Sequence, residues 1–291
     1  MVCCNVSLRI RRGRGPQIAR VRGGADPWRD SIRRLSPTTA AWWTRATAIV
    51  CIGKPAVTHG EKPAVVLHGG PGSGCTIWHR RLFDPHAYRV VLFDQRGCGR
   101  SVPHASDPNT DLAVNTTPKL IADMERLRRH LNIDRWLVLG GSLGSTLALA
   151  YAESHTERVT EIILFGATTG RRREVDWCSA AGPRCSSRRS GSACAPPCLR
   201  GDRDGDIIET CHRLLHDRDP AVRQQAAFGW CTWESAGIAW PPTPRLAPRF
   251  TDPAYAMAFA RLVTHYVRHN AWLEDDGLLP GVGRWLPCPG S

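Results

Sequence analysis

A serine flanked by glycines is the residue pattern in this chain that most clearly indicates chemistry. Ser142 lies in Gly140-Gly141-Ser142-Leu143-Gly144, between an apolar run and an Ala/Leu-rich segment. A G-x-S-x-G turn from strand to helix is tight, so it needs small neighbours, and it lifts the serine hydroxyl clear of the sheet. The first amides of the following helix face developing negative charge, so the Leu143 N–H is an expected oxyanion donor. The pattern predicts a nucleophilic serine, and the alternative is a purely structural Gly-Ser turn.

A second glycine-rich segment follows another apolar run. Residues 68–74 read HGGPGSG and come directly after Ala64-Val65-Val66-Leu67. In lipases and esterases such a loop supplies the second backbone N–H of the oxyanion hole. A phosphate-binding loop is the rival interpretation, but the segment lacks the Gly-Lys-Ser/Thr ending and the helix start that such loops carry. The segment therefore favours acyl chemistry over phosphate binding.

Short apolar runs and helical segments between residues 61 and 177 must position these two turns. The runs predict strands at 64–67, 89–93, 136–139 and 161–165, each apolar enough to be buried on both faces. Between the second and third strands the spacing predicts a helix, with Thr117 as its N-cap and Pro118 in its first turn. Another helix is predicted over 145–152. The alternation predicts a parallel α/β sheet whose chemistry lies beyond the carboxyl ends of its strands.

Residues 204–276 have a helical period and no strand-like run. We expect them to form a helical cap on the sheet domain, followed by a truncated return to the core over 277–291. Three tryptophans in or beside the cap helices, Trp230, Trp233 and Trp240, could line a pocket. Core packing is the commoner role of any one of them.

The formal net charge of +13 is concentrated in two blocks. Residues 1–60 hold 11 basic and 2 acidic residues, and residues 178–203 hold 5 and 1. Neither block shows a strand or helix period, so we expect a disordered basic N-terminal segment and an atypical Cys/Arg-rich insert. Two explanations stay open: functional basic segments, or sequence not selected for folding, as a change of reading frame would produce. The first would allow nucleic-acid binding, but the balanced charge elsewhere argues against a nucleic-acid partner.

Composition excludes several classes of protein. A hydrophobic fraction of 42% excludes global disorder, and no apolar stretch is long enough to span a bilayer, so no membrane partner is expected. The N-terminus lacks the apolar region of a signal peptide, which predicts a cytoplasmic protein with reduced cysteines. Five of the 12 cysteines, four of them in the insert, lie near each other in sequence without metal-ligand spacing: Cys178, Cys185, Cys194, Cys198 and Cys211. No metal or other cofactor is expected.

Several motifs, in order along the chain, resemble those of the proline iminopeptidases, serine peptidases of the α/β-hydrolase fold. They read HGGPGSGCTIWHRRLFDPHAYRVVLFDQRGCGRS, NTTPKLIADMERLRRHLNIDRWLVLGGSLGSTLALAYAESHTERVTEIILFG, RREVDW, DPAVRQQAAFGWCTWE and TDPAYAMAFARLVTHYVRHNAWLEDDGLL, and cover about two-thirds of the chain. The resemblance implies an α/β-hydrolase parallel sheet with a helical cap. It also implies removal of N-terminal proline from small peptides through a serine acyl-enzyme.

The resemblance assigns roles to particular residues. Ser142 matches the family nucleophile, and Leu143 replaces the tryptophan usual after it, which keeps the backbone donor and changes the pocket wall. Gly70 matches the second oxyanion donor. Glu234 matches a cap glutamate that binds the free amino group of the substrate, a sensible pairing for an exopeptidase. A second acidic residue of some members would fall near Val263 and is absent.

The catalytic base and its orienting acid are the missing part of the pattern. A serine nucleophile needs both, and the family carries them as Asp and His on two strands after the cap. Here the chain reads GLLPGVGRWLPCPGS after the cap, so we expect the last strands to be lacking and the activity to be impaired. Asp94 is expected to be structural. The histidines after Ser142 are expected in surface or core roles: His155, His212, His216, His265 and His269.

Two rival functions stay open. One is another serine esterase or amidase on the same fold, although Glu234 in its W-x-x-W-E context favours the peptidase. The other is a non-catalytic binding protein that uses the basic N-terminal arm. The oligomeric state is not predicted.

Overall fold

The computed structural model describes the backbone and nearly all side chains of residues 62–171, 173–174, 206–238, 246–274 and 277–278. Four further strands, within residues 6–52, are described by their backbone alone. The predicted segment boundaries near residues 60, 177, 203 and 276 and the insert at 178–203 stay predictions. The sequence predicts no regular element in residues 1–60, whereas the structure has four strands within residues 6–52. For the remaining residues of this segment, which lie outside the described part, disorder stays a prediction. The expected absence of late strands concerns residues after 278, which lie outside the described part.

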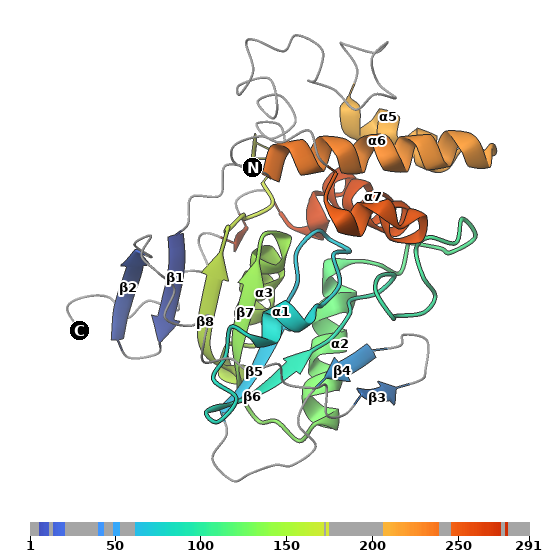
Figure 1. Cartoon of the computed structure of the whole chain (residues 1–291). Helices are drawn as coiled ribbons and strands as arrows, with labels where there is room; N and C mark the ends of the chain where they lie inside the picture. Colours follow the sequence, from blue (N-terminus) through green and yellow to red (C-terminus); the bar gives the residue numbers. More distant parts are fainter. Residues whose placement is uncertain are drawn as a thin grey trace.

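A six-stranded sheet forms the centre of the molecule, in the order β2-β1-β8-β7-β5-β6 (Figure 1). Its four parallel strands are β5 (Lys62–Leu67), β6 (Tyr88–Leu92), β7 (Trp136–Gly141) and β8 (Val159–Phe165). The antiparallel strand β1 (Val6–Arg11) pairs with β8 and with β2 (Arg14–Arg20), while β3 (Ala40–Trp43) and β4 (Ile49–Ile52) form a separate pair. The four strands predicted between residues 61 and 177, and the parallel α/β class, are confirmed.

The order of the parallel strands creates a switch point between β5 and β7. These strands are neighbours, with Val65 opposite Val138 and Leu67 opposite Gly140. The chain leaves β5 toward β6 on one side and leaves β7 toward β8 on the other. The loops after two such strands diverge and leave a crevice at the sheet edge, which is where open α/β sheets bind ligands. Both sequence motifs of interest therefore emerge at this crevice.

The helices of the sheet domain are α1 (Ile77–Arg80), α2 (Thr117–His130) and α3 (Leu143–Ser154), with the 3₁₀ turn η1 (Thr156–Arg158) after α3. The predicted N-cap of α2 is wrong by one residue. Thr116 has the extended backbone of the N-cap, and Thr117 begins the helix. The Thr117 hydroxyl does not cap the helix but donates to the Ala271 carbonyl at 2.5 Å. A contact between residues distant in sequence thus replaces the expected local cap.

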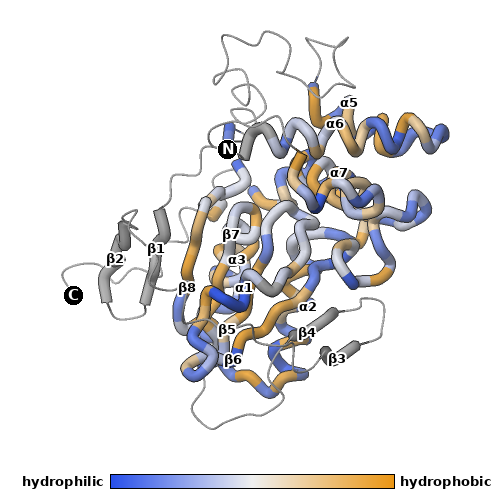
Figure 2. Tube along the Cα trace, viewed as in Figure 1, coloured by the Kyte–Doolittle hydropathy of each residue, from blue (hydrophilic) through white to orange (hydrophobic). Residues whose placement is uncertain are grey.

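The main core lies between the sheet and helices α2 and α3. The strand side chains Val65, Leu67 and Val138 are fully buried, as are Met124 of α2 and Tyr151 of α3. In Figure 2 the parallel strands carry the hydrophobic colour through the middle of the domain. Apolar burial of this kind contributes about 25 cal/mol per Å² and is the main term that holds the layers together.

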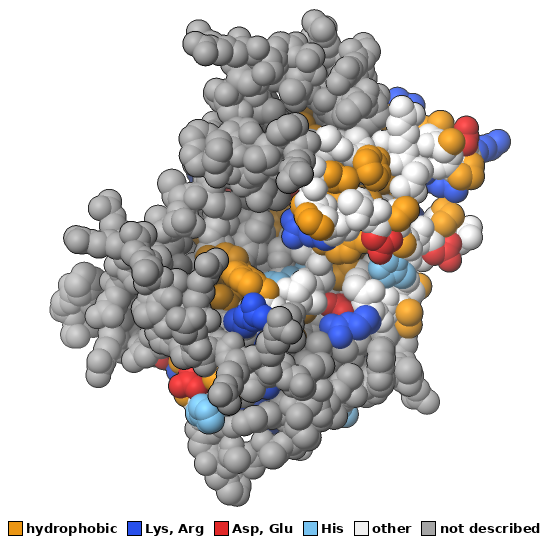
Figure 3. All heavy atoms as spheres, in the orientation of Figure 1, with side chains coloured by type: hydrophobic (Ala, Val, Ile, Leu, Met, Phe, Trp, Pro, Cys, Tyr) orange, Lys and Arg blue, Asp and Glu red, His pale blue; other side chains and the backbone are white. Residues whose placement is uncertain are grey.

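The cap consists of α5 (Ile207–Leu215), α6 (Pro220–Ile238) and α7 (Pro253–Arg268), with the 3₁₀ turns η3 (Pro248–Thr251) and η4 (Asn270–Trp272). These helices gather at one end of the sheet (Figure 1). Asp206 caps α5 and Asp252 caps α7 through side-chain hydrogen bonds. The cap has its own core, in which Trp230 is buried and Trp233 packs at the edge, whereas Trp240 lies outside the described residues. On the face visible in Figure 3, cap side chains of hydrophobic and charged types are mixed.

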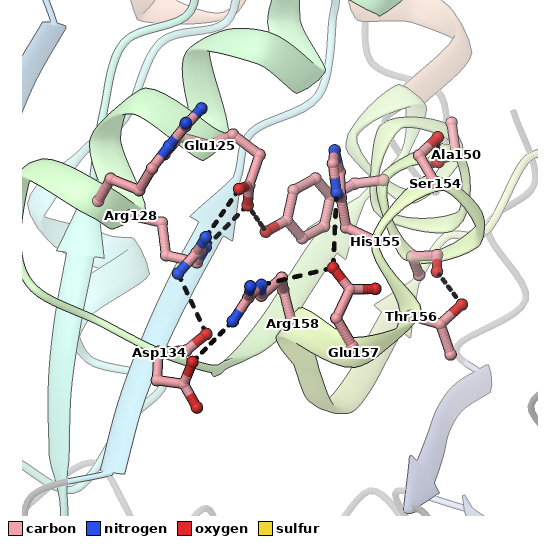
Figure 4. A network of polar contacts seen from close by, with 12 residues as sticks. Glu125, Arg128, Asp134, Ala150, Ser154, His155, Thr156, Glu157 and Arg158 are labelled. Carbon is pink, nitrogen blue, oxygen red and sulfur yellow. Dashed lines mark hydrogen bonds and ion pairs between the residues drawn. The ribbon is translucent and has the colours of Figure 1, made fainter.

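A network of charged and polar groups lies at the C-terminal ends of α2 and α3 (Figure 4). The Glu125 carboxylate accepts hydrogen bonds from Arg128 at 2.8 Å and from the Tyr151 hydroxyl at 2.7 Å. The Arg128 guanidinium also donates to the carbonyl oxygens of Ile133 and Asp134. These bonds join the end of α2 to α3 and to the loop before β7.

Among the described residues, no helix combines the length and the apolar composition that crossing a membrane requires.

Candidate active site

Ser142 lies at the sharp turn between β7 and α3. Its backbone angles are φ 53° and ψ −131°, a region that non-glycine residues rarely occupy. The Ser142 N–H donates to the Phe165 carbonyl at 3.1 Å, and the Ser142 carbonyl accepts from the Ser145 N–H at 2.7 Å. Strained backbone held by surrounding bonds is typical of functional sites, and here it presents a partly exposed hydroxyl at the top of the sheet.

The glycines around Ser142 are required by close packing. A Cβ on Gly141 would lie 2.1 Å from the Phe165 ring, and a Cβ on Gly140 would lie 2.3 Å from the Gly144 carbonyl oxygen. A Cβ on Gly144 would lie 2.1 Å from the Leu67 carbonyl oxygen. Real Cβ contacts are longer than this, so α3 packs closely against β5 and β7 only because these positions are glycine. The predicted strand–turn–helix elbow is thus present in the structure.

The glycine-rich loop after β5 lies against the elbow. A Cβ on Gly69 would lie 2.8 Å from the Ser142 Cβ and 3.5 Å from its Oγ. Gly70, the next residue, has φ +115°, which favours glycine. The structure therefore brings Ser142, Leu143 and the Gly69–Gly70 segment together. Gly69 was not singled out from the sequence, because its role depends on the packing of two loops about 70 residues apart.

His68 anchors the start of this loop as a neutral ring. Its Nδ1 bonds to the Gly69 carbonyl at 3.0 Å, and its Nε2 accepts from the Gln95 N–H at 3.1 Å. These partners assign the proton to Nδ1. Burial lowers the pKa of His68 to about 4, so the ring keeps its acceptor nitrogen at neutral pH. His68 thereby joins the glycine-rich loop to the end of β6.

Asp94 holds the neighbouring turns. Its buried carboxylate accepts from the backbone N–H groups of Cys75 at 2.7 Å and Arg100 at 3.0 Å, and from the Arg100 Nε at 2.9 Å. These contacts fit the structural role that the sequence resemblance implies.

The loop after β8 also supports the elbow. The Thr168 N–H donates to the Ser145 Oγ at 3.0 Å, and the Thr146 hydroxyl donates to the Thr168 carbonyl at 2.8 Å. Ser145 and Thr146 lie in the first turn of α3, so this loop contacts the helix that begins directly after Ser142. None of these residues stood out in the sequence, since nothing local marks two hydroxyls as partners of a loop 22 residues away.

A small cavity lies beside the elbow. Its volume is about 20 Å³, enough for about one water molecule, and Leu143, His68, Pro71 and Tyr266 are among the residues that line it. The Leu143 side chain therefore forms part of a wall between the glycine-rich loop and helix α7. The cap closes over the same loop, because the Tyr255 hydroxyl donates to the Ser73 carbonyl at 3.0 Å.

Glu234 lies on α6 in the cap. Its side chain is half-buried, and desolvation raises the pKa of its carboxyl, while the positive charge of Arg249 opposes that increase. A desolvated carboxylate is stabilised by a cation, so the position suits an ammonium group. The contacts that the structure describes do not join Glu234 to Ser142.

The five histidines after Ser142 lie away from the elbow. His155 follows the last residue of α3, about 18 Å along the helix axis from Ser142. His212, His216, His265 and His269 lie together in the cap, where the rings of His212 and His216 are 4.3 Å apart and those of His265 and His269 are 5.2 Å apart. These positions agree with the predicted surface and core roles.

Within the described residues, no group of three or more His, Cys, Asp and Glu side chains is arranged to hold a metal ion. Cys211 is buried in α5 with the cap core, and the other four clustered cysteines lie outside the described part.

Comparison with known proteins gives one consistent result. Residues 62–182 match the α/β hydrolase fold family. Probable proline iminopeptidase from Streptomyces coelicolor is 50% identical over 221 residues, which cover 75% of this chain and 66% of the relative. Proline iminopeptidase from Xylella fastidiosa is 44% identical over 238 residues, covering 80% of this chain and 72% of the relative.

The solved structure of proline iminopeptidase from Mycobacterium smegmatis is 21% identical to this chain, with a TM-score of 0.45, and the match covers 78% of this chain and 70% of that one. Probable proline iminopeptidase from Leptolyngbya boryana is 42% identical over 229 residues, which cover 78% of this chain and 70% of the relative. The chain spans about two-thirds of the length of its curated relatives, and it belongs to the proline iminopeptidase family of α/β hydrolases.

Proposed function

We propose that this protein is a serine aminopeptidase that releases N-terminal proline from small peptides, with Ser142 as its nucleophile. The observation that carries the proposal is the elbow at Ser142, whose strained backbone and surrounding glycines place a hydroxyl against the oxyanion loop. Family membership supplies the substrate class. A cytoplasmic location fits small peptides as substrates.

In the proposed reaction the Ser142 Oγ attacks the carbonyl carbon of the N-terminal prolyl residue and forms a tetrahedral oxyanion. Its collapse breaks the prolyl peptide bond, and the amine of the remaining peptide leaves with the proton that the Ser142 hydroxyl gave up. Water then hydrolyses the prolyl ester of Ser142 and releases proline. The N–H groups of Leu143 and Gly70 donate to the oxyanion, since the former begins α3 and the latter follows the residue packed on Ser142. Glu234 binds the secondary ammonium of the substrate. Pairing of that ammonium with a desolvated carboxylate selects a free N-terminus, because a blocked amine would leave the carboxylate unpaired.

The test of the reaction is hydrolysis of proline p-nitroanilide by the purified chain. Ser142→Ala should reduce turnover to background, because the nucleophile carries the acyl transfer. Ser154→Ala, at the other end of α3 with its hydroxyl bonded to the Ala150 carbonyl, is the matched control and should keep wild-type turnover. Turnover that survives in Ser142→Ala would exclude Ser142 as the nucleophile.

The role of Glu234 has a separate test. Glu234→Gln should raise KM for proline p-nitroanilide about 30-fold or more, the effect of losing one partner of a desolvated charge pair at roughly 2 kcal/mol or above. Glu209→Gln, at an exposed carboxylate paired with Arg268, is the control and should leave KM unchanged. An equal response of both variants would remove Glu234 from the substrate site.

The rival function, a general esterase or amidase on this fold, predicts another outcome. It requires hydrolysis of p-nitrophenyl esters without hydrolysis of proline p-nitroanilide, and indifference to Glu234→Gln.

A further inference from the structure

Glu174 is an acidic residue with an unusual set of partners. Its Oε2 accepts from the Thr168 hydroxyl at 2.8 Å and from the backbone N–H groups of Thr169 at 2.9 Å and Gly170 at 3.2 Å. Its Oε1 accepts from the Thr169 hydroxyl at 2.7 Å and lies 3.4 Å from the Arg171 Nε. Four donors from three consecutive residues thus converge on one carboxylate.

This set of bonds determines the conformation of the loop after β8. Burial tends to raise the pKa of Glu174, but the bonds from Thr169, Thr168 and Gly170 outweigh burial and leave the pKa lowered. The carboxylate is therefore ionised at neutral pH, and each bond to it is stronger than one between neutral groups. Gly170 has φ +73°, so the loop also contains a backbone turn that favours glycine.

The loop in turn is bonded to the first turn of α3. The Thr168 N–H donates to the Ser145 Oγ, and that hydroxyl donates to the Ser142 carbonyl. The Thr168 carbonyl accepts from the Thr146 hydroxyl. A continuous path of hydrogen bonds therefore runs from Glu174 through Thr168 and Ser145 to the Ser142 peptide.

We propose that Glu174 is a positioning residue for the nucleophile: its carboxylate fixes residues 168–170, and these fix the Ser142 peptide and the first turn of α3. The inference rests on the proposed function, because it takes Ser142 as the nucleophile. The elbow needs such support because of its backbone conformation. Ser142 occupies a sparsely populated backbone region, which persists only where the surroundings hold it.

The experiment compares Glu174→Ala with wild type in two measurements. In hydrolysis of proline p-nitroanilide we expect kcat to fall about 10- to 100-fold, because small displacements of a reacting group cost that much, while KM stays within about twofold. In hydrogen exchange followed by mass spectrometry, peptides over 142–149 should exchange at least about tenfold faster, while peptides over β5 and β6 stay unchanged.

Two matched variants separate positioning from a general loss of structure. Glu174→Gln keeps an oxygen for the Thr169 and Gly170 N–H groups, so it should recover most of kcat and most of the exchange protection. Glu157→Ala removes an exposed carboxylate beside α3 that pairs with Arg158 and should change neither quantity.

Each outcome decides the proposal. Unchanged kcat and unchanged exchange over 142–149 in Glu174→Ala would overturn it, and so would a rise in KM alone, which would make Glu174 a substrate-binding residue. If the wild-type chain does not hydrolyse proline p-nitroanilide, the proposed function fails. The exchange measurement on Glu174→Ala still decides the positioning role of Glu174. Faster exchange confined to residues 142–149 supports that role, and unchanged exchange refutes it.

Discussion

Two clusters of titratable side chains, one in the sheet domain and one in the cap, satisfy their polar atoms very differently. In the sheet domain, Glu125, Arg128 and Tyr151 are buried, and hydrogen bonds join all three (Figure 4). In the cap, four histidine rings form two contacting pairs, His212 with His216 at the end of α5 and His265 with His269 at the end of α7. The His212 Nδ1 and the His265 Nε2 are buried with no hydrogen-bond partner in the part of the chain that is described. Burial of a charged group costs free energy unless an opposite charge or a hydrogen-bond partner compensates it, so the two clusters should respond differently to a change of charge.

The surroundings of the two clusters favour opposite charge states of their titratable groups. The hydrogen bond from Arg128 is the main reason that the pKa of Glu125 is lowered to about 2, so the ionised form is favoured in the folded state. Desolvation, together with the other cations nearby, lowers the pKa values of His212 and His265 to about 4, so their charged forms are disfavoured there. The folded state therefore favours an ionised Glu125 in the sheet-domain cluster, whereas it favours neutral imidazole rings in the cap cluster.

His216 links the cap cluster to the anchoring of α7. Its Nδ1 donates to the His212 carbonyl at 2.8 Å, which leaves Nε2 to accept from the Arg261 Nη2 at 3.4 Å. The buried Arg261 guanidinium also donates to the carbonyl oxygens of Ala105 and Thr110, among others in that loop. Protonation of His216 would remove the acceptor and place two cations side by side. The cap therefore depends on a neutral His216 where it meets the sheet domain.

The largest expected effect comes from breaking the sheet-domain cluster. Glu125→Ala leaves the Arg128 guanidinium buried with only carbonyl partners, which should lower the free energy of unfolding by about 3–5 kcal/mol. Urea unfolding followed by circular dichroism measures it. A loss below about 1 kcal/mol would show that the network is no more than a surface ion pair.

Acidification should act on the cap histidines before it acts on the Glu125 network of the sheet domain. The folded pKa of His212 and of His265 lies below the unfolded value of about 6.5, so the folded state binds fewer protons. Stability from this source is complete above about pH 6.5 and falls as the pH drops toward 4. Because the rings are partly screened by solvent, we expect a total loss of roughly 2 kcal/mol. The Glu125 contribution persists above about pH 4.5 and is lost only as the pH falls toward 2.

Hydrogen exchange at pH 7 and pH 5 measures which region loses stability first on acidification. Peptides over α5 and α7 should lose protection at pH 5, while those over α2, which carries Glu125 and Arg128, should keep it. The charged and titratable groups that face one another there are His212, His216, His265, His269, Arg261, Arg268 and Glu209. His265→Phe removes one titrating ring next to Trp272 and should flatten the pH dependence. Equal loss of protection in both regions would refute the contrast.

A smaller effect is expected from Tyr151→Phe. The ring stays in the core beside Trp136, and only the hydrogen bond to Glu125 is lost. We expect a loss of about 1 kcal/mol in the free energy of unfolding, the usual value for one such bond. A loss as large as that of Glu125→Ala would mean that the hydroxyl, not Arg128, is the essential partner.

The smallest effect is expected at the exposed rim of the same network. Asp134→Ala removes the ion pair to Arg158, in which the aspartate side chain is 79% exposed. Surface pairs of this kind contribute about 0–1 kcal/mol, so unfolding should change by less than about 0.5 kcal/mol. Addition of salt should reduce even that difference.

Much of the fold was predictable from local patterns. The apolar runs predicted the four parallel strands, and the glycines beside Ser142 predicted a tight turn that the structure contains. The helical period of residues 204–276 predicted a helical cap, and the structure has α5, α6 and α7 there. These predictions succeed because strand burial, helix period and turn sterics depend on residues close in sequence. The one-residue error at Thr117 arose where a contact with Ala271, 154 residues away, replaced a local cap.

The chain by itself determined which elements form and where a serine nucleophile could stand. Only the tertiary structure decided that Gly69 lies against Ser142, that Glu174 fixes the loop beside the elbow, and that Glu125 is paired while the cap histidines are not. Each of these facts depends on side chains brought together by the packing of the sheet, its helices and its loops. Sequence periodicity records which face of an element is buried, but it does not record which polar group will meet which across the layers.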